Sequence, residues 1–155
     1  MPDLPWYSDG LRFECTQCGR CCSGAPGYVL FTSEEAERIA ERLGVSVQEF
    51  LDRYTTHLKM PVSGRSRTFK EIESEHGNDC IFLDRATQPG KTLCAIHDLR
   101  PAQCRTFPFW PEHVESPRSW QRLSRECEGI ERGPIVPLTQ IRVQVEISQR
   151  DRARQ

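Results

Sequence analysis

Four cysteines lie within eight residues near the start of this chain, at Cys15, Cys18, Cys21 and Cys22. Thiols two residues apart on a tight, glycine-containing turn can converge on one ion or cluster, because thiolates are the soft ligands that zinc and iron–sulfur clusters require. Successive side chains point in different directions, so either Cys21 and Cys22 bind at different sites or only one of them is a ligand. This segment predicts a fold organised around metal.

The remaining four cysteines follow singly, at Cys80, Cys94, Cys104 and Cys127. The first residues lack the basic region and apolar stretch of a secretory signal, and no apolar run approaches the about 20 residues that cross a bilayer. We therefore expect a cytoplasmic protein without a membrane partner. Because a reducing cytosol disfavours disulfides, metal ligation is the favoured role of the thiols.

The bulk composition indicates one small domain. With 155 residues, 37% of them hydrophobic, the chain can bury a modest core, so residues 1–155 are expected to form a single domain. The formal net charge of -1 predicts no nucleic-acid partner. Residues 1–12 are expected to be an irregular arm, and residues 150–155 a frayed tail.

Two helices are predicted after the cysteine segment. Thr32 and Glu35 have the spacing of a capping box, and Gly44 is placed to end the first helix. Ser46 and Glu49 repeat the device for a second, short helix. The apolar positions recur at helical spacing in both, at Ala36, Ile39, Ala40 and Leu43 and then at Val47, Phe50, Leu51 and Tyr54.

Strands are expected in the middle of the chain. Residues 28–31 are a short apolar run typical of a strand, whereas residues 59–78 are expected to form a loop around one edge strand. Residues 80–83 and 92–96 are apolar segments separated by a polar turn, which predicts a β-hairpin.

Beyond the hairpin, Pro101 fits the first turn of a helix that holds Cys104, with Asp98 as its cap. A polar, helix-like stretch from about residue 119 is expected to end at Cys127, and the apolar residues after Pro137 fit either a strand or a helix. These elements predict a small, metal-stabilised α+β domain in which short helices and a short β-hairpin surround the cysteine cluster.

The cysteine-bearing motifs resemble the CxxCxxCC family of zinc- or iron-chelating domains, YkgJ-like proteins that are also described as iron–sulfur cluster containing proteins. The resemblance rests on Phe13-x-Cys15-x-x-Cys18-Gly19-x-Cys21-Cys22, Cys80-x-Phe82-Leu83-Asp84, Cys94-x-Ile96, Arg100-Pro101-x-x-Cys104-Arg105-x-Phe107-Pro108-Phe109 and Cys127-x-Gly129-Ile130. It implies that all eight cysteines belong to the metal site or sites. His97 stands where members of the family often have tyrosine, so no obligatory chemistry is assigned to it.

Eight thiolates suit two four-coordinate centres. A C-x-x-C-x-x-C triplet with a distant fourth cysteine is typical of cubane clusters, so an iron–sulfur cluster, 4Fe–4S in type, is favoured over zinc or iron ions. We expect Cys15, Cys18 and one of Cys21 or Cys22 to share a centre with a later cysteine. Arg100 and Arg105 bracket Cys104 and are expected to offset the charge of the sulfurs.

Three functions remain open from the sequence. The first is a metal-binding protein with a redox or accessory role and an unidentified protein partner. The second is an enzyme, because a related cysteine cluster in flagellin lysine N-methylases implies methyl transfer; however, the chain has no glycine-rich cofactor loop and no catalytic triad, so no catalytic residue is predicted. The third is a structural zinc protein. The four histidines, Asp84 and Asp98 are assigned surface, turn or capping roles, with His97 the nearest to a ligand position.

Overall fold

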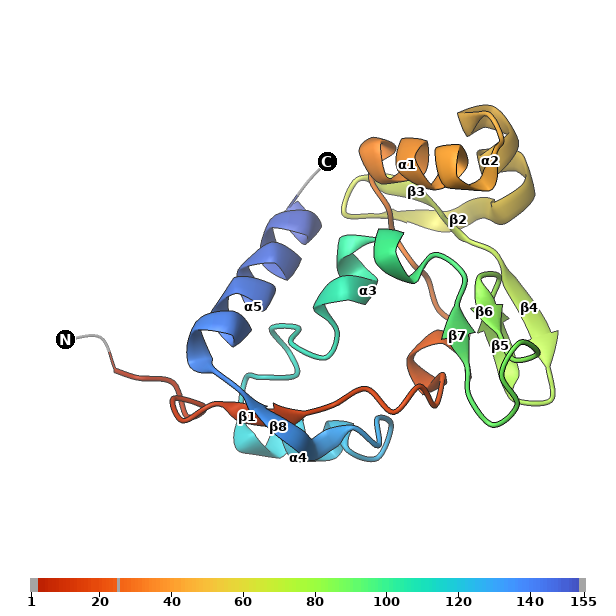
Figure 1. Cartoon of the computed structure of the whole chain (residues 1–155). Coiled ribbons are helices and arrows are strands. Elements are labelled where there is room, and N and C mark those ends of the chain that lie inside the picture. The colour runs from red at the N-terminus through yellow and green to blue at the C-terminus, as the bar shows by residue number, and fades with distance from the viewer. Residues whose placement is uncertain (1–2, 25, 154–155) are drawn as a thin grey trace.

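Two separate clusters of buried apolar side chains organise the computed structural model, which describes residues 3–24 and 26–153 (Figure 1). We call the first the terminal cluster, because its strands and one of its helices come from the two ends of the chain. It consists of Leu11, Phe109, Val114, Trp120, Leu123, Ile130 and Ile141. The central cluster consists of Ala36, Ile39, Ala40, Phe50, Phe69, Phe82 and Ile96. Cys127 packs against the terminal cluster, whereas Cys80 and Cys94 pack against the central one. The later cysteines are thus divided between the clusters.

The terminal cluster joins elements from the beginning and the end of the sequence. Its elements are β1 (Leu11–Phe13), α4 (Pro117–Leu123), β8 (Ile130–Val136) and α5 (Leu138–Ala153). β1 pairs antiparallel with β8, which places Leu11 opposite Val136. Within the cluster the rings of Phe109 and Trp120 are stacked, with centroids 5.8 Å apart. This pairing holds the start of the cysteine segment beside β8.

The central cluster lies under two short helices. Its main elements are α1 (Ser33–Leu43), α2 (Val47–Tyr54), β2 (Thr55–Val62) and β3 (Arg65–Phe69). The predicted capping box is confirmed, because Thr32 accepts a hydrogen bond from the Glu35 backbone while the Glu35 carboxylate accepts one from the Thr32 backbone. Gly44 ends α1 in the left-handed conformation, as the sequence predicts. Phe50 of α2 is fully buried.

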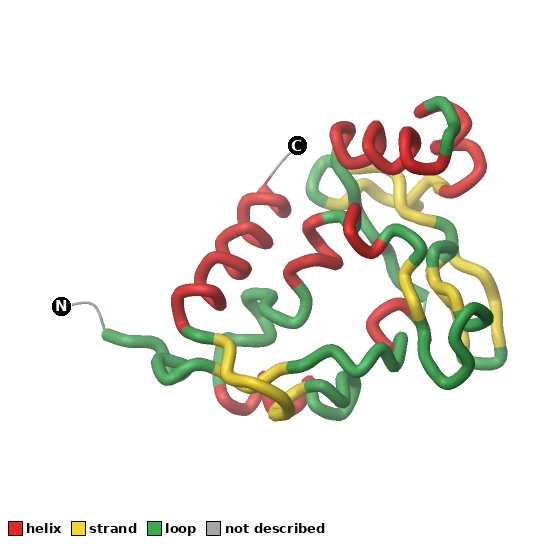
Figure 2. The backbone as a smooth tube through the Cα atoms, in the orientation of Figure 1, coloured by secondary structure: helices red, strands yellow, loops and turns green. Residues whose placement is uncertain are grey.

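The cysteine-bearing hairpins lie between these parts. The remaining elements are η1 (Arg20–Cys22), β4 (Glu71–Ser74), β5 (Gly77–Cys80), β6 (Leu83–Asp84), β7 (Leu93–Cys94), η2 (His97–Leu99) and α3 (Ala102–Thr106). β4 pairs with β5 and β6 with β7, both antiparallel. Figure 2 shows how short these strands are and how much loop joins them. The mixture of short helices and hairpins confirms the predicted α+β class, and β6–β7 confirms the predicted hairpin.

Several local predictions are wrong. Residues 28–31 form no strand, because the backbone amides of two of them bond to side chains: Leu30 donates to Gln103 and Val29 to Thr68. Residues 59–78 are not a loop around one edge strand but include all of β3 and β4 and half of both β2 and β5, hairpin strands whose largely exposed faces give little alternation. Asp98 does not cap α3, because its carboxylate binds Arg42; Pro101 occupies the cap position instead.

The carboxyl-terminal part also differs from expectation. α4 ends at Leu123, so Cys127 lies beyond it in a turn where its backbone donates to the Leu123 carbonyl. The ambiguous stretch after Pro137 is helical, and α5 runs on to Ala153 where the sequence predicts fraying. Residues 1–2 of the predicted arm and 154–155 of the predicted tail lie outside the described residues. Within the described residues, no helix has the length and apolar character needed to span a membrane.

Candidate metal centre

The cysteine segment, residues 14–24, is fastened at its start beside Cys127. The Glu14 backbone donates a hydrogen bond to the Gly129 carbonyl at 3.2 Å, and the Thr16 hydroxyl donates to the carboxylate of Glu128. Because Gly129 and Glu128 directly follow Cys127, these contacts bring Cys15 towards Cys127. The segment therefore begins at the terminal cluster.

The middle of the segment is fastened beside Cys94. The backbone and the hydroxyl of Thr92 both donate to the Gln17 carbonyl, at 3.0 and 2.8 Å. Gly19 approaches Thr92 so closely that an added Cβ would lie 2.4 Å from its hydroxyl oxygen, and its φ of +79° favours glycine. This approach starts the turn η1, which carries Cys21 and Cys22.

The end of the segment is fastened beside Cys80. The Ser23 hydroxyl donates to Asp79 at 2.6 Å, and the Asn78 backbone donates to the Gly24 carbonyl at 2.8 Å. Arg85 holds Asp79 with two hydrogen bonds, at 2.8 and 2.9 Å, and donates to Ser23 as well. The ribbon in Figure 1 accordingly runs from β1 across to the β5–β7 side of the molecule. The segment thus bridges the two clusters and passes all the regions that carry later cysteines.

One group of thiols gathers on the hairpin and α3 side. Burial raises the pKa of Cys104 well above its ordinary value, and the nearby thiols of Cys80 and Cys94 raise it further because like charges repel. Burial likewise raises the pKa of Cys80 to about 11, and the thiols of Cys94 and Cys21 add to the effect. These mutual effects identify Cys21, Cys80, Cys94 and Cys104 as electrostatic neighbours. We call them the strand group.

A second group gathers near the turn after α4. Burial raises the pKa of Cys127, and the thiols of Cys18, Cys21 and Cys15 raise it further. Cys15, Cys18 and Cys127, which we call the turn group, therefore share one electrostatic neighbourhood. Cys21 contributes to both neighbourhoods.

Cys21 and Cys22 lie between the groups. Their sulfur atoms are 3.7 Å apart, and the hydrogen bond between the two thiols is the largest cause of the raised pKa of Cys21. All eight cysteines are free thiols, and none of them is fully buried. Within residues 3–24 and 26–153, no three His, Cys, Asp or Glu side chains are already arranged to hold an ion. The donor chemistry and the two gathered groups nevertheless fit zinc or iron, because both prefer four thiolates.

The arginines expected to support the sulfurs occupy different settings. Arg100 is close enough to lower the pKa of Cys21, Cys94 and Cys104 from the values that burial and like charges give them. Arg105 donates to the Arg100 carbonyl and lies 3.9 Å from the Glu35 carboxylate. Its role beside a sulfur stays a prediction.

The histidines and the two aspartates keep ordinary roles. His57, His76 and His97 are exposed, and His113 is stacked on Trp110. Asp84 accepts hydrogen bonds from the Ala86 and Thr87 backbones, so it stabilises a turn as the sequence predicts.

Sequence reasoning missed the residues that hold the segment in place. Ser23 lies far in the sequence from Asp79 and Arg85, and the three residues carry no motif, so their contact depends on the tertiary fold. The acidic residue before Cys80 is a signal that could have drawn attention to Asp79.

Replacing Asp79 with asparagine is expected to lower the free energy of unfolding by about 1.5–3 kcal/mol, because the charged hydrogen bonds from Arg85 are lost at a largely buried position. Arg85 holds the pKa of Asp79 well below its usual range, so this stabilisation is present above the unfolded-state pKa of about 3.9 and is lost as the pH falls further. Urea unfolding at pH 7 and pH 3 measures both effects. The exposed Asp98→Asn variant serves as the control and should lose much less stability, because its ion pair with Arg42 is screened by solvent; equal losses in the two variants would contradict the prediction.

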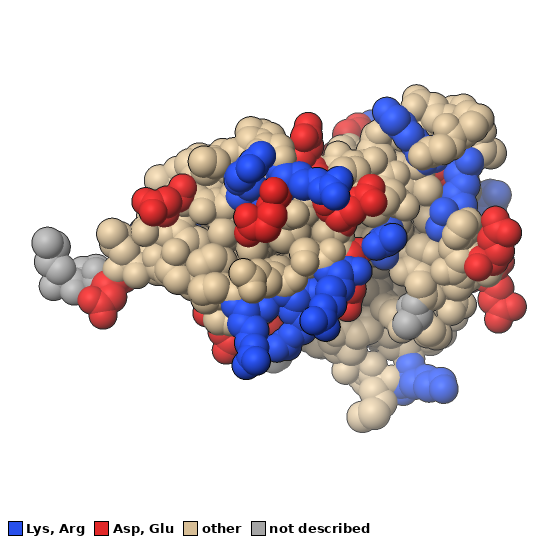
Figure 3. Space-filling model, turned by 90° about the horizontal axis from the view of Figure 1, so that it is seen from below, with Lys and Arg blue, Asp and Glu red and all other residues tan. Residues whose placement is uncertain are grey.

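Surface charge around the turn group is mixed. Arg118, Arg122 and Arg125 are exposed on α4 and the turn that follows it, while Glu126 and Glu128 flank Cys127. Figure 3 shows basic and acidic side chains intermixed on the face that carries β1, β8 and α4.

Comparison with known proteins agrees with the cysteine pattern. Residues 14–128 match the model of the CxxCxxCC family, described as "Putative zinc- or iron-chelating domain". An uncharacterised protein of Methanocaldococcus jannaschii, MJ0661, is 33% identical over 103 residues, which cover 66% of this chain and 48% of the relative. The aligned part of the chain thus spans about half the length of that relative. No solved structure matches the chain.

Proposed function

The chain belongs to the CxxCxxCC family of zinc- or iron-chelating domains, and from this premise we propose that its eight cysteines hold two metal centres, iron–sulfur in type, with a redox or accessory role. The observation that carries the proposal is the path of the cysteine segment, which is fastened beside Cys127 at its start and beside Cys94 and Cys80 further on. Two groups of thiols are what two four-coordinate centres require.

The grouping suggests which thiols share a centre. Cys80, Cys94 and Cys104 would hold one centre together with Cys21, since each of their pKa values is raised by Cys21. Cys15, Cys18 and Cys127 would hold the other, with Cys22 as the fourth ligand. The adjacent cysteines would thus serve different centres, and these centres would lie close together because the sulfur atoms of Cys21 and Cys22 are 3.7 Å apart.

The chain's own residues would prepare the two centres differently. An iron–sulfur cluster would supply one-electron chemistry. Cys104 is partly buried, whereas Cys15 of the turn group and Cys21 of the strand group are exposed. Arg100 offsets negative charge among the thiolates of the strand group. Electron transfer would need a protein partner, and each group would offer that partner one exposed thiol, Cys15 or Cys21.

Anaerobic purification followed by iron, sulfide and zinc analysis tests the proposal. We expect iron and acid-labile sulfide in equal amounts, approaching about eight of each per chain for two 4Fe–4S clusters, with visible absorbance that bleaches on reduction. Stoichiometric zinc in a colourless protein would contradict the iron–sulfur assignment.

A structural zinc protein is the second candidate. It is favoured by the bridge that the cysteine segment makes between two small hydrophobic clusters, since metal cross-links there would contribute directly to folding. Zinc analysis combined with unfolding on chelation would distinguish it from the redox protein.

A further inference from the structure

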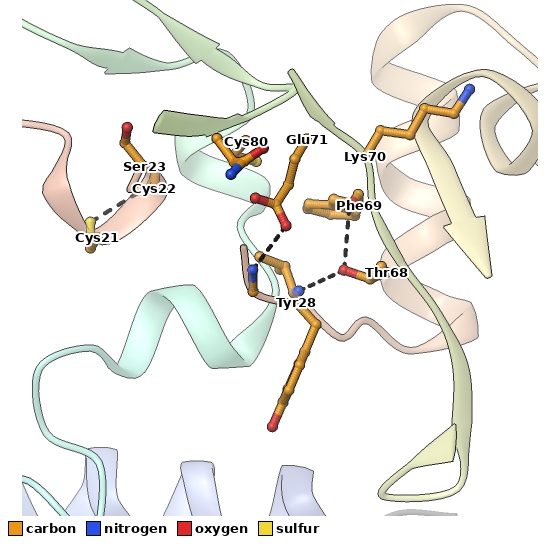
Figure 4. A pocket seen from close by; sticks show the side chains of 12 residues that line it. Cys21, Cys22, Ser23, Tyr28, Thr68, Phe69, Lys70, Glu71 and Cys80 are labelled. Carbon is orange, nitrogen blue, oxygen red and sulfur yellow. Dashed lines mark hydrogen bonds between the residues drawn. The ribbon is translucent and has the colours of Figure 1, made fainter. Parts of the chain in front are cut away.

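A cavity of about 100 Å³ opens beside the strand group. Cys21, Cys22 and Cys80 line it together with Glu71. Figure 4 shows these residues around the cavity, contributed by the cysteine segment on one side and the β4–β5 hairpin on the other. Three thiol-bearing residues and one carboxylate residue thus line one small space.

The position of Glu71 follows from strand register. Glu71 is paired directly with Cys80 in the antiparallel hairpin, and side chains of directly opposed residues lie on the same face of a sheet. One carboxylate oxygen accepts a hydrogen bond from the Gly27 backbone at 3.0 Å, which fixes the group at the cavity wall. The other oxygen accepts none from the described residues.

The charge of Glu71 is left without a cation. Among the described residues no lysine, arginine or histidine forms an ion pair with it. The neighbouring Lys70 lines the cavity through its stem, but its ammonium group donates to the Asp52 carbonyl and extends away, as Figure 4 shows. A carboxylate beside thiols with no countercharge creates a field that attracts a positive ion.

We propose that this cavity is the entry port through which a divalent metal ion, Fe²⁺ or Zn²⁺, reaches the strand group, and that Glu71 is the first ligand it meets. The inference rests on the proposed function. Carboxylates bind such ions less selectively than thiolates do, so an ion held by Glu71 passes readily to the softer sulfur donors at Cys21 and Cys80. Entry from the opposite side of Cys80 is hindered by the packing of Cys80 and Cys94 on the central cluster.

Stopped-flow loading of the metal-free, reduced full-length chain with Co²⁺ tests the port, because thiolate ligation of cobalt produces a visible absorbance. The variants are Glu71→Gln, which keeps an oxygen for the Gly27 backbone, and Glu73→Gln, which removes the same charge from the same face of β4 outside the cavity lining. We expect Glu71→Gln to load about tenfold more slowly with an unchanged final absorbance, and Glu73→Gln to load at the wild-type rate. Added salt should slow the wild type more than Glu71→Gln.

Wild-type loading rates in Glu71→Gln, or equal slowing in Glu73→Gln, would overturn the port while leaving the metal centres intact. A lower final absorbance in Glu71→Gln would also overturn it, since Glu71 would then belong to the finished centre. Absence of a cobalt signal in the wild-type protein would overturn the port too, whereas the proposed function is refuted separately, by the absence of iron and acid-labile sulfide from the anaerobically purified protein.

Discussion

Replacing Cys104 with serine is expected to abolish one metal centre and to leave the other intact, which halves the metal content of the chain. Burial raises the pKa of Cys104 well above its ordinary value, so this thiol is shielded from solvent. An exposed neighbouring side chain therefore cannot replace it as a ligand. Replacing Cys127 with serine is expected to remove the centre of the turn group instead. Metal and sulfide analysis of both single variants, with matched circular dichroism, measures the effect.

The double variant Cys104→Ser/Cys127→Ser provides the internal control, because losses at two independent centres should add to complete loss of metal. Loss of all metal in either single variant would show one shared centre rather than two. Full metal content in both would show that neither thiol is a ligand.

Replacing Trp120 with alanine is expected to lower the free energy of unfolding by about 3–5 kcal/mol, the usual cost of removing a large buried aromatic side chain. Trp120 is 1% exposed, stacks on Phe109, and donates from its indole nitrogen to Glu131 at 2.7 Å. The cost is a large fraction of the stability of a small domain. Denaturant unfolding of the metal-loaded protein measures it.

The variant Trp120→Phe separates packing from hydrogen bonding at this position. It keeps a ring against Phe109 and loses the bond to Glu131, so its cost should be well below that of Trp120→Ala. Met60→Ala, at a side chain that is 76% exposed, should change stability by no more than about 0.5 kcal/mol. A loss under 1 kcal/mol in Trp120→Ala would refute the view that the terminal cluster depends on this ring.

Local signals made some elements predictable from the sequence. The capping box of Thr32 and Glu35 and the stop at Gly44 act within a few residues of each other, so the bounds of α1 follow from the sequence. β2 and β3 were missed because their pairing depends on the Ser63–Gly64 turn, where both residues have positive φ, rather than on alternating apolar residues. The sequence of α5 was ambiguous because its apolar positions fit both the period of a strand and that of a helix. Burial of Ile141 in the terminal cluster favours the helix.

The candidate site was predictable in its donors but not in its arrangement. The cysteine spacing predicts metal binding, because the type of ligand is a property of the residues themselves. The contacts that place the thiols are long-range, such as Ser23 with Asp79 and Thr92 with Gln17, and no short motif encodes them. The position of the unpaired Glu71 carboxylate beside Cys80 depends on the register of β4 and β5, which no sequence motif indicates.

The bridge formed by the cysteine segment has a consequence for communication across the molecule. Its ends are tied to different clusters, at Gly129 and at Asp79, so any contraction of the thiols around an ion pulls on both. Metal binding would thereby change how the two halves are set relative to each other. A partner that touches both halves would then respond to whether the thiols hold metal through the shape of the protein, without contacting the metal.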